Sequence, residues 1–246
     1  MAGKVRLDKL LVERGLAESR AKAQALVMAG CVYSETRRLD KPGHPMDPAI
    51  PLEVKGRDHP WASRGGLKLA HGFDHFKIDA REKTCLDIGA STGGFTDVLL
   101  HAGARRVYAV DVGKGQLAWK LRTDDRVVVL DETNARHLTA AEVPEAIDLI
   151  TCDASFIGLR TVLPAALALV RPGARLVALI KPQFEVGPDR VGKGGIVRDP
   201  TLHKEACDRV AGWLKDDMGW TVLGVSESPV TGADGNREFL IGAEKR

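Results

Sequence analysis

The segment from Thr84 to Asp97 constrains the fold of this chain more than any other. It runs from the apolar stretch TCLDI through the glycine-rich turn GASTGG into the helix-like FTD. A strand, a glycine-rich turn and a helix in this order build a nucleotide pocket at one edge of an open α/β sheet. Downstream, apolar runs alternate with amphipathic ones, including a helix expected over residues 160–170. We therefore expect an α/β fold with a doubly wound, mostly parallel sheet.

The spacing of this turn narrows the class of ligand. Ser91 stands where a dinucleotide site needs its second glycine, and no G-K-[ST] follows to hold a triphosphate. The spacing D-x-G-x-x-x-G instead resembles the signature of S-adenosylmethionine (SAM) methyltransferases. Asp111 ends the apolar run VYAV, 22 residues after Gly89, where an acid can bind ribose hydroxyls at the end of a second strand.

This resemblance implies SAM as the cofactor and a set of residues that hold it. The glycines of the turn allow positive φ and let a ligand approach the backbone closely. Asn134 follows the third expected strand, where methyltransferases read the adenine, although asparagine is also a good turn residue. The candidate cofactor-binding residues are Asp87, Gly89, Ser91, Thr92, Gly93, Gly94, Asp111, Asn134 and Asp153.

Composition excludes several other classes. The four cysteines are scattered, without a C-x-x-C pair or a histidine spacing suited to zinc, so we expect reduced thiols and no metal site. The N-terminus has no apolar signal core, and the longest uncharged apolar run, Val162 to Val170, is too short to cross a bilayer. We expect a cytoplasmic protein without stable membrane association, and the oligomeric state stays open.

The first quarter of the chain differs from the rest in charge and pattern. Residues 1–60 hold eleven Lys or Arg against eight Asp or Glu, so the net charge of +3 lies wholly there. Leu7, Leu10 and Leu11 share one face of a first helix, and Ser19 is placed to cap a second. Short strand-like runs follow. We expect a separate, small α+β module over residues 1–59.

This module resembles the S4-type RNA-binding domain. The likeness rests on the pattern R-L-D-x-x-L-V-x-x-G-L-x-x-S-R-x-x-A-x-x-L-V-x-x-G-x-V, which begins at Arg6. The usual V-N-G end of its hairpin is replaced here by Y-S-E. The resemblance implies that phosphates are contacted by Arg6, Lys9, Arg20 and Lys22. The alternative is a pair of solvated helices.

Four charged residues, far apart in the sequence, are each placed at the same rim of the expected sheet. Asp153 and Lys181 follow the fourth and fifth strands, and Glu238 opens the last strand, which we expect to be antiparallel. Lys68 lies in the first turn of a helix, where a cation is disfavoured by the helix dipole. The candidate catalytic residues are Lys68, Asp153, Lys181 and Glu238. The alternative is two surface salt bridges, which contribute little to stability.

The motifs around these residues resemble those of the TlyA family. They are SRGGLKL from residue 63, DASF from 153, IKPQFE from 180 and GNREF from 235, in an order similar to the Lys-Asp-Lys-Glu tetrad of FtsJ-like RNA 2′-O-methyltransferases. The resemblance implies a class I SAM methyltransferase domain with a seven-stranded sheet over residues 60–246. It also implies methylation of a cytidine 2′-hydroxyl in 16S rRNA, 23S rRNA or both, with rRNA, a ribosomal subunit or the ribosome as partner.

The chemistry of such a reaction assigns roles to the four residues. A ribose 2′-hydroxyl is a weak acid, so a base must begin to remove its proton during transfer. Lysine can be that base only when neutral, and a nearby cation such as Lys68 or the SAM sulfonium lowers its pKa. We assign Lys181 as the base, while Asp153 and Glu238 orient the amines.

Two other classes of function stay open at this point. One is a non-catalytic RNA-binding or ribosome-assembly factor that uses SAM only as a structural ligand. The other is a membrane-active haemolysin, which the family's second name suggests.

Overall fold

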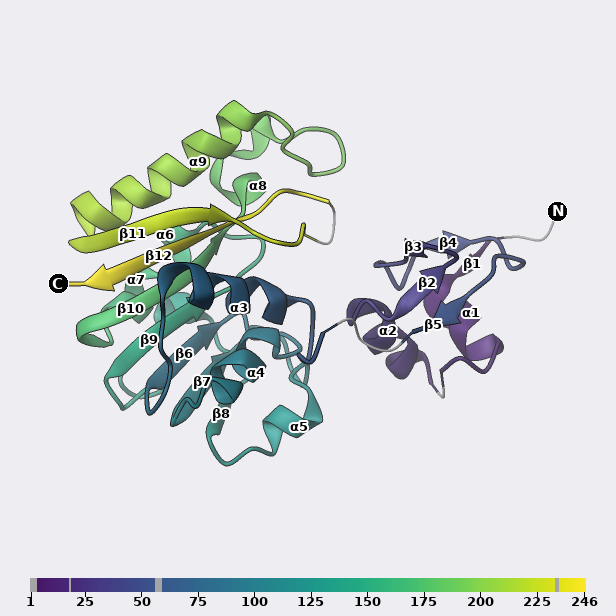
Figure 1. The fold of residues 1–246 in the computed structure, drawn as a ribbon, viewed down its shortest axis with the longest axis horizontal. Coiled ribbons are helices and arrows are strands. Elements are labelled where there is room, and N and C mark those ends of the chain that lie inside the picture. Colours follow the sequence, from purple (N-terminus) through teal and green to yellow (C-terminus); the bar gives the residue numbers. More distant parts are fainter. Residues whose placement is uncertain (1–3, 18, 56–58, 233–234) are drawn as a thin grey trace. The chain divides into compact units, whose positions relative to one another are not determined.

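The described chain divides into two compact units. A computed structural model describes residues 4–17, 19–55, 59–232 and 235–246. The first unit is Met1–Arg64 and the second is Gly65–Arg246 (Figure 1). The boundary that we expected after residue 59 falls within the last residues of the first unit. Each unit has its own hydrophobic core.

The first unit is a small α+β structure. Its described residues form two helices and two small antiparallel sheets. One sheet pairs β1 with β4, and the other has the strand order β3-β2-β5. Their bounds are β1 Val5–Arg6, α1 Leu7–Glu13, α2 Arg20–Met28, β2 Val32–Ser34, β3 Arg37–Arg38, β4 Pro45–Met46 and β5 Glu53–Val54. The Ser19 hydroxyl accepts a hydrogen bond from the Lys22 backbone N–H at 3.2 Å, which caps α2 as its sequence predicted. Leu7, Leu10 and Leu11 are buried in the core.

The second unit is built on one seven-stranded sheet in the order β11-β12-β10-β9-β6-β7-β8. Its strands are β6 Thr84–Ile88, β7 Arg106–Val110, β8 Val127–Leu130, β9 Ile147–Cys152, β10 Val170–Ile180, β11 Trp220–Glu227 and β12 Phe239–Lys245. The first five of these run parallel, and β12 is antiparallel to both β10 and β11. The expected doubly wound sheet with an antiparallel last strand is therefore confirmed.

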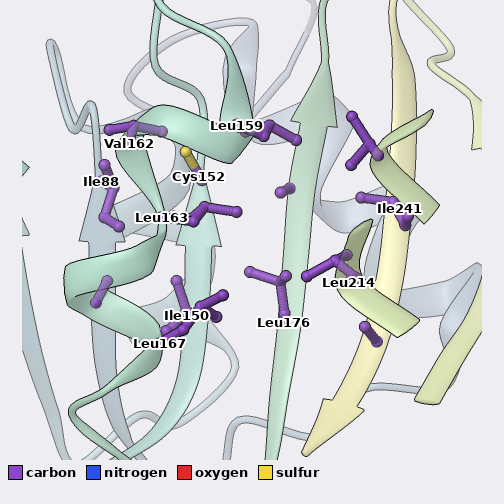
Figure 2. Packing of buried hydrophobic residues seen from close by; sticks show 14 of the residues in the cluster. Ile88, Ile150, Cys152, Leu159, Val162, Leu163, Leu167, Leu176, Leu214 and Ile241 are labelled. Carbon is purple, nitrogen blue, oxygen red and sulfur yellow. The ribbon is translucent and has the colours of Figure 1, made fainter. Parts of the chain in front are cut away.

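Helices cover both faces of this sheet (Figure 1). The helices of the unit are α3 Gly65–Phe76, α4 Gly94–His101, α5 Trp119–Arg122, α6 Leu159–Val162, α7 Pro164–Leu167, α8 Pro182–Glu185 and α9 Pro200–Gly212, which a π-helical turn extends over Trp213–Asp217. On one face α3 packs closely against β12. The Phe76 ring of α3 lies over Gly242 of β12, where an added Cβ would lie only 2.5 Å from the ring. On the other face Leu163, Leu167 and Leu214 pack onto β9, β10 and β12 (Figure 2).

The expected helix over residues 160–170 is wrong. Two short helices, α6 and α7, meet at Leu163, and Val170 already begins β10. Pro164 explains the break, because proline has no backbone N–H and fits only the first turn of a helix, where it sits in α7. Pro172 and Gly173 lie inside β10 at an irregularity between Val170 and Arg175, one of the few places where a strand tolerates proline.

Candidate active site

A pocket of about 460 Å³ lies at the carboxyl ends of β6, β7 and β9. This is the rim where open α/β sheets bind their ligands. Its wall is formed by Ile88, Gly89, Ser91, Val110, Asp111, Val112, Gln116, Thr133, Asn134, Ala135, Arg136, Asp153, Ala154, Ser155, Phe156, Ile157 and Val162. Gly89, Ser91, Asp111, Asn134 and Asp153, five of the residues predicted to bind the cofactor, are thus brought together.

The glycines of the turn after β6 allow other parts of the chain to pack closely against the turn. Gly89 has φ +78°, and a Cβ there would lie 3.0 Å from the backbone of Ala154. Gly93 has φ +94° and caps α4, and a Cβ there would lie 2.2 Å from a methyl group of Leu121. We expected these positions to admit a ligand, whereas the nearest atoms belong to Ala154, in the loop after β9, and to Leu121, in α5. Thr92, Gly93 and Gly94 are not among the described residues that line the pocket.

Asp111 and Asn134 are both fixed at the pocket wall by backbone hydrogen bonds. The Asp111 carboxylate accepts from the Ser91 N–H at 2.8 Å and from the Gly113 N–H at 2.7 Å. It therefore ties the turn after β6 to the end of β7. The Asn134 side chain accepts from the Arg136 N–H at 3.1 Å and caps the 3-10 helix Ala135–His137.

Asp87 lies beneath the turn, away from the pocket wall. Its carboxylate is fully buried and accepts hydrogen bonds from the hydroxyls of Thr96, at 2.6 Å, and Thr151, at 3.0 Å. Burial raises the pKa of Asp87 to about 6, although the two hydroxyls oppose that shift. Asp87 thus links β6 to α4 and β9, and it supports the turn from inside the protein.

The four candidate catalytic residues form two close ion pairs. Lys181 Nζ lies 2.6 Å from Asp153 Oδ1, and Lys68 Nζ lies 2.5 Å from Glu238 Oε2. Their side chains are only 4 to 22% exposed. Lys181 also donates to the Ser155 hydroxyl at 2.9 Å and to the Asp153 carbonyl at 3.2 Å. Asp153 and Ser155 line the pocket as well, so the Lys181 pair adjoins it.

The sheet topology explains why these residues meet. Asp153 and Lys181 follow the neighbouring parallel strands β9 and β10, which end at the same rim. Glu238 immediately precedes β12. Because β12 runs antiparallel to β10, it begins at the rim where β10 ends. Lys68 reaches Glu238 from the N-terminal part of α3.

The electrostatic surroundings of Lys181 differ from our expectation. Burial acts to lower its pKa, but the charges of Asp153 and then Glu238 raise it, and the net shift is upward. We expected a nearby cation to lower this pKa. The two carboxylates outweigh the effect of burial on the pKa, so Lys181 is held in its charged form.

The candidate phosphate-binding residues all lie on or beside the two helices of the first unit. Arg6 and Arg20 both donate hydrogen bonds to Asp8. Lys9 Nζ lies 3.6 Å from Glu13 Oε1, in a pair whose side chains are half exposed or more. Lys22 is an exposed residue in the first turn of α2.

Sequence reasoning missed Ser155, Phe156 and Gln116 as individual residues of the site. Ser155 and Phe156 directly follow Asp153, so the DASF run contained the signal for them. Phe156 is 90% exposed, and its ring centroid lies 5.4 Å from that of Phe184. Gln116 contacts the Ser91 hydroxyl at 3.3 Å, and nothing in its local sequence marks it.

No helix among the described residues is long and apolar enough to span a bilayer.

Comparisons with known proteins follow the division of the chain. The model of the FtsJ-like methyltransferase family matches residues 61–245, and that of the S4 domain matches residues 5–48. A candidate rRNA methyltransferase of Bacillus subtilis, YqxC, is 52% identical over 97% of this chain and 85% of its own. The 16S/23S rRNA (cytidine-2′-O)-methyltransferase TlyA of Mycobacterium tuberculosis is 46% identical over 98% of this chain and 90% of its own.

A solved structure agrees over the full chain. It is a protein of Streptococcus thermophilus described as a candidate hemolysin, with 42% sequence identity and a TM-score of 0.77, and the match covers 100% of this chain and 90% of that one. This match spans both units. The chain therefore belongs to the TlyA family, in which an S4 domain precedes an FtsJ-like methyltransferase domain.

Proposed function

We propose that this protein transfers a methyl group from SAM to the 2′-hydroxyl of a cytidine in 16S rRNA, 23S rRNA or both. The observation that carries the proposal is that the Lys181–Asp153 ion pair adjoins the pocket. Asp153 and Ser155 line the pocket and also bind the Lys181 amine. The activity of the Mycobacterium tuberculosis relative supports the same assignment. We also infer a cytoplasmic location, where ribosomes are found.

The pocket fits a cofactor of the size and chemistry of SAM. Its volume of about 460 Å³ lies within the range of small-molecule sites. Asp111 and Asn134 both line the pocket, and in this proposal Asp111 binds the ribose hydroxyls and Asn134 reads the adenine edge. Ile157 and Val162 supply apolar surface for a base. SAM, when bound, supplies an electrophilic methyl group on a sulfonium.

The remaining candidate cofactor residues have a shaping role in this proposal. Gly89 lets the turn after β6 lie against the loop that carries Asp153. Gly93 caps α4 and Gly94 is its first residue. Asp87 links β6 to α4 through its hydrogen bond from the Thr96 hydroxyl. Ser91 and Thr92 complete the turn, and the backbone carbonyl of Thr92 accepts a hydrogen bond from the Ala118 N–H at 3.2 Å.

Lys181 is proposed as the group that removes the proton of the hydroxyl. Its amine is nearly buried and held by three oxygen acceptors, so its position is fixed. Its raised pKa means that only a small fraction is neutral near pH 7. The proposal therefore requires a rate that grows as pH rises, because the neutral amine is the active form.

Lys68, Asp153 and Glu238 are proposed as orienting groups. Asp153 fixes the Lys181 amine, and Glu238 fixes the Lys68 amine at the same rim. Two positive and two negative charges in a site with little solvent give a field that can stabilise charge developing on the attacking oxygen. The first unit, which carries the S4 domain, is proposed to hold the rRNA.

The test uses rRNA that lacks the modification. Ribosomal subunits and naked rRNA from a strain without the gene would be incubated with the enzyme and SAM labelled on its methyl group. We expect label in RNA, on the 2′-oxygen of a cytidine, by nuclease digestion and mass spectrometry. SAM binding without label in any rRNA would refute the enzymatic assignment and favour a non-catalytic assembly factor.

A further inference from the structure

The first unit contains a buried carboxylate that two arginines share. Asp8 in α1 has no exposed surface. Its oxygens accept from Arg6 Nε and Nη2 at 3.1 and 2.9 Å, and from Arg20 Nε at 3.0 Å. The Gln24 amide at 2.8 Å and the Lys9 backbone N–H at 2.9 Å complete the set of donors. One acid thus joins β1, α1 and α2.

The arginines themselves reach the surface. The side chain of Arg6 is 49% exposed and that of Arg20 is 58% exposed, whereas Asp8 between them is fully covered. Asp8 engages only Nε of Arg20, and Nε and one Nη of Arg6. Because a guanidinium has five N–H donors, both arginines keep donors that a ligand can use. The hydrogen bonds from Arg6 and Gln24 hold the pKa of Asp8 well below its usual range, so the group is charged at neutral pH.

A second observation concerns Gly43, which faces the same guanidinium. A Cβ at this position would lie 3.0 Å from Nη1 of Arg6 and 3.2 Å from Cζ. The φ of Gly43 is one that any residue can adopt, so backbone conformation does not demand glycine there. The absence of a side chain leaves room for the Arg6 head group in its place beside Asp8.

We propose that Asp8 is a positioning residue that presets Arg6 and Arg20 as a two-pronged clamp for the phosphates of RNA. This inference rests on the proposed function and adds to it the device by which the first unit would hold its substrate. Arginine side chains lose rotamer freedom when a ligand immobilises them, and this loss opposes binding. A carboxylate that already fixes their planes removes part of that cost before RNA binds.

The proposal predicts that loss of the Asp8 charge weakens RNA binding, whereas simple electrostatics predicts that it strengthens RNA binding. Removal of a negative charge from an RNA-binding surface normally strengthens binding. Asp8→Asn should instead weaken binding on the order of tenfold, because an amide offers one acceptor oxygen and turns an N–H₂ group toward the guanidinium ions. Glu13→Gln is the matched control, because it removes the same charge from an exposed site on the same helix. It should leave RNA affinity unchanged or slightly higher.

The measurement is fluorescence anisotropy of a labelled rRNA hairpin with the full chain, over a range of salt concentrations. Gly43→Ala changes no charge, and it should weaken binding severalfold by displacing Arg6. Asp8→Asn should raise KM for rRNA in methyl transfer more than it lowers kcat. Equal or tighter RNA binding by Asp8→Asn would overturn the proposal.

A double-mutant cycle separates positioning from folding. In a background with Arg6→Ala and Arg20→Ala, Asp8→Asn should have no further effect on RNA affinity, since the groups it positions are gone. A loss as large as in the wild-type background would mean that Asp8 acts through the fold, and the proposal would fail. Failure of the proposed function itself would look different, because wild-type protein would then not label rRNA at all.

Discussion

Lys181 shows how one side chain can serve both structure and chemistry. Its amine has an acid, a hydroxyl and a carbonyl around it, all supplied by the loop after β9. Such a set of acceptors orients the amine, and it also favours the charged form, which cannot accept a proton. The proposed reaction has to work against that preference, and this conflict makes the base assignment testable.

Removal of the amine should stop the reaction without emptying the cofactor pocket. Lys181→Ala should lower kcat by at least about a hundredfold, the usual contribution of a general base, while SAM affinity measured by calorimetry stays within error. Lys181→Arg should be equally inactive, because a guanidinium keeps its proton at any working pH. Transfer of labelled methyl groups by Lys181→Arg at a rate near that of wild type would exclude Lys181 as the base.

The pH dependence of the rate should follow the same lysine. Because the pKa of Lys181 is raised, the wild-type rate should increase with pH up to the alkaline limit of stability. Asp153→Asn removes the larger of the two charges that raise this pKa, so the rising limb should move to lower pH. The measurement is kcat against pH for both proteins. A limb that stays in place would contradict the electrostatic account.

Asp87 gives a prediction about stability. Its pKa is about 6 in the folded protein against 3.8 for an unperturbed group, so the folded state binds the proton more tightly. The contribution of Asp87 to stability is therefore largest below pH 4 and is lost as pH rises toward 6. A shift of about two units corresponds to about 3 kcal/mol at most.

Replacement of Asp87 by asparagine should remove this pH dependence. Asp87→Asn keeps the shape and can still bond to the two threonine hydroxyls, so its free energy of unfolding should fall less than that of wild type between pH 4 and 6. Urea unfolding at several pH values measures the difference. Parallel curves for the two proteins would show that Asp87 does not titrate in this window.

At the scale of elements, Asn236 joins the segment before α9 to the start of β12. Its buried side chain accepts from the Val197 N–H at 3.0 Å and donates to the Gly195 carbonyl at 2.9 Å. Glu238 lies two residues further along and pairs with Lys68. The position of residues 187–197 is thus tied to the chain that delivers one of the candidate catalytic acids.

Loss of this connection should loosen the loop and destabilise the protein. Asn236→Ala leaves a buried N–H and a carbonyl without their partners, which costs about 1–3 kcal/mol. Urea unfolding and limited proteolysis within residues 187–197 are the measurements. Lys193→Ala, at an exposed position in the same loop, is the control and should change neither. Proteolysis of Asn236→Ala at the wild-type rate would refute the role of this side chain.

The sequence predicted elements best where pattern and turn chemistry agreed. The strand, turn and helix from Thr84 onward, the cap at Ser19 and the antiparallel last strand were all expected. The segment 160–174 was not, because its helical periodicity continues past Pro164, and Pro172 reads as a stop between elements. Backbone hydrogen bonding to β9 decided that Val170 belongs to a strand, and no local pattern contains that information.

The four charged residues singled out in the sequence form two ion pairs, but which residue pairs with which was not predictable. Strand order places Asp153, Lys181 and Glu238 at one rim, and the sequence motifs select Lys68, on α3, as well. Which amine meets which acid depends on the direction of β12 and on the position of α3, and both are tertiary features. The same holds for Asp8, which reads from the sequence as an ordinary acid in the first turn of a helix.

At the scale of the whole molecule, the division into two units predicts separable functions. The excess positive charge lies in residues 1–60, and the second unit has its own core and pocket. A protein that lacks residues 1–60 should therefore lose most of its salt-dependent RNA affinity and keep its affinity for SAM. Filter binding and calorimetry measure the two. Methylation of ribosomes at the full rate by the truncated protein would show that the first unit is dispensable.

The position of β12 also bears on the order in which the protein is assembled. β11 lies at the edge of the sheet and pairs with β12, which follows it in the chain. Lys68 can pair with Glu238 only after the ribosome has added a further 170 residues to the chain. Domains fold as units during synthesis, beginning from the N-terminus. A nascent chain will therefore complete its S4 domain, and with it the proposed grip on RNA, long before it can assemble the pair that modifies RNA.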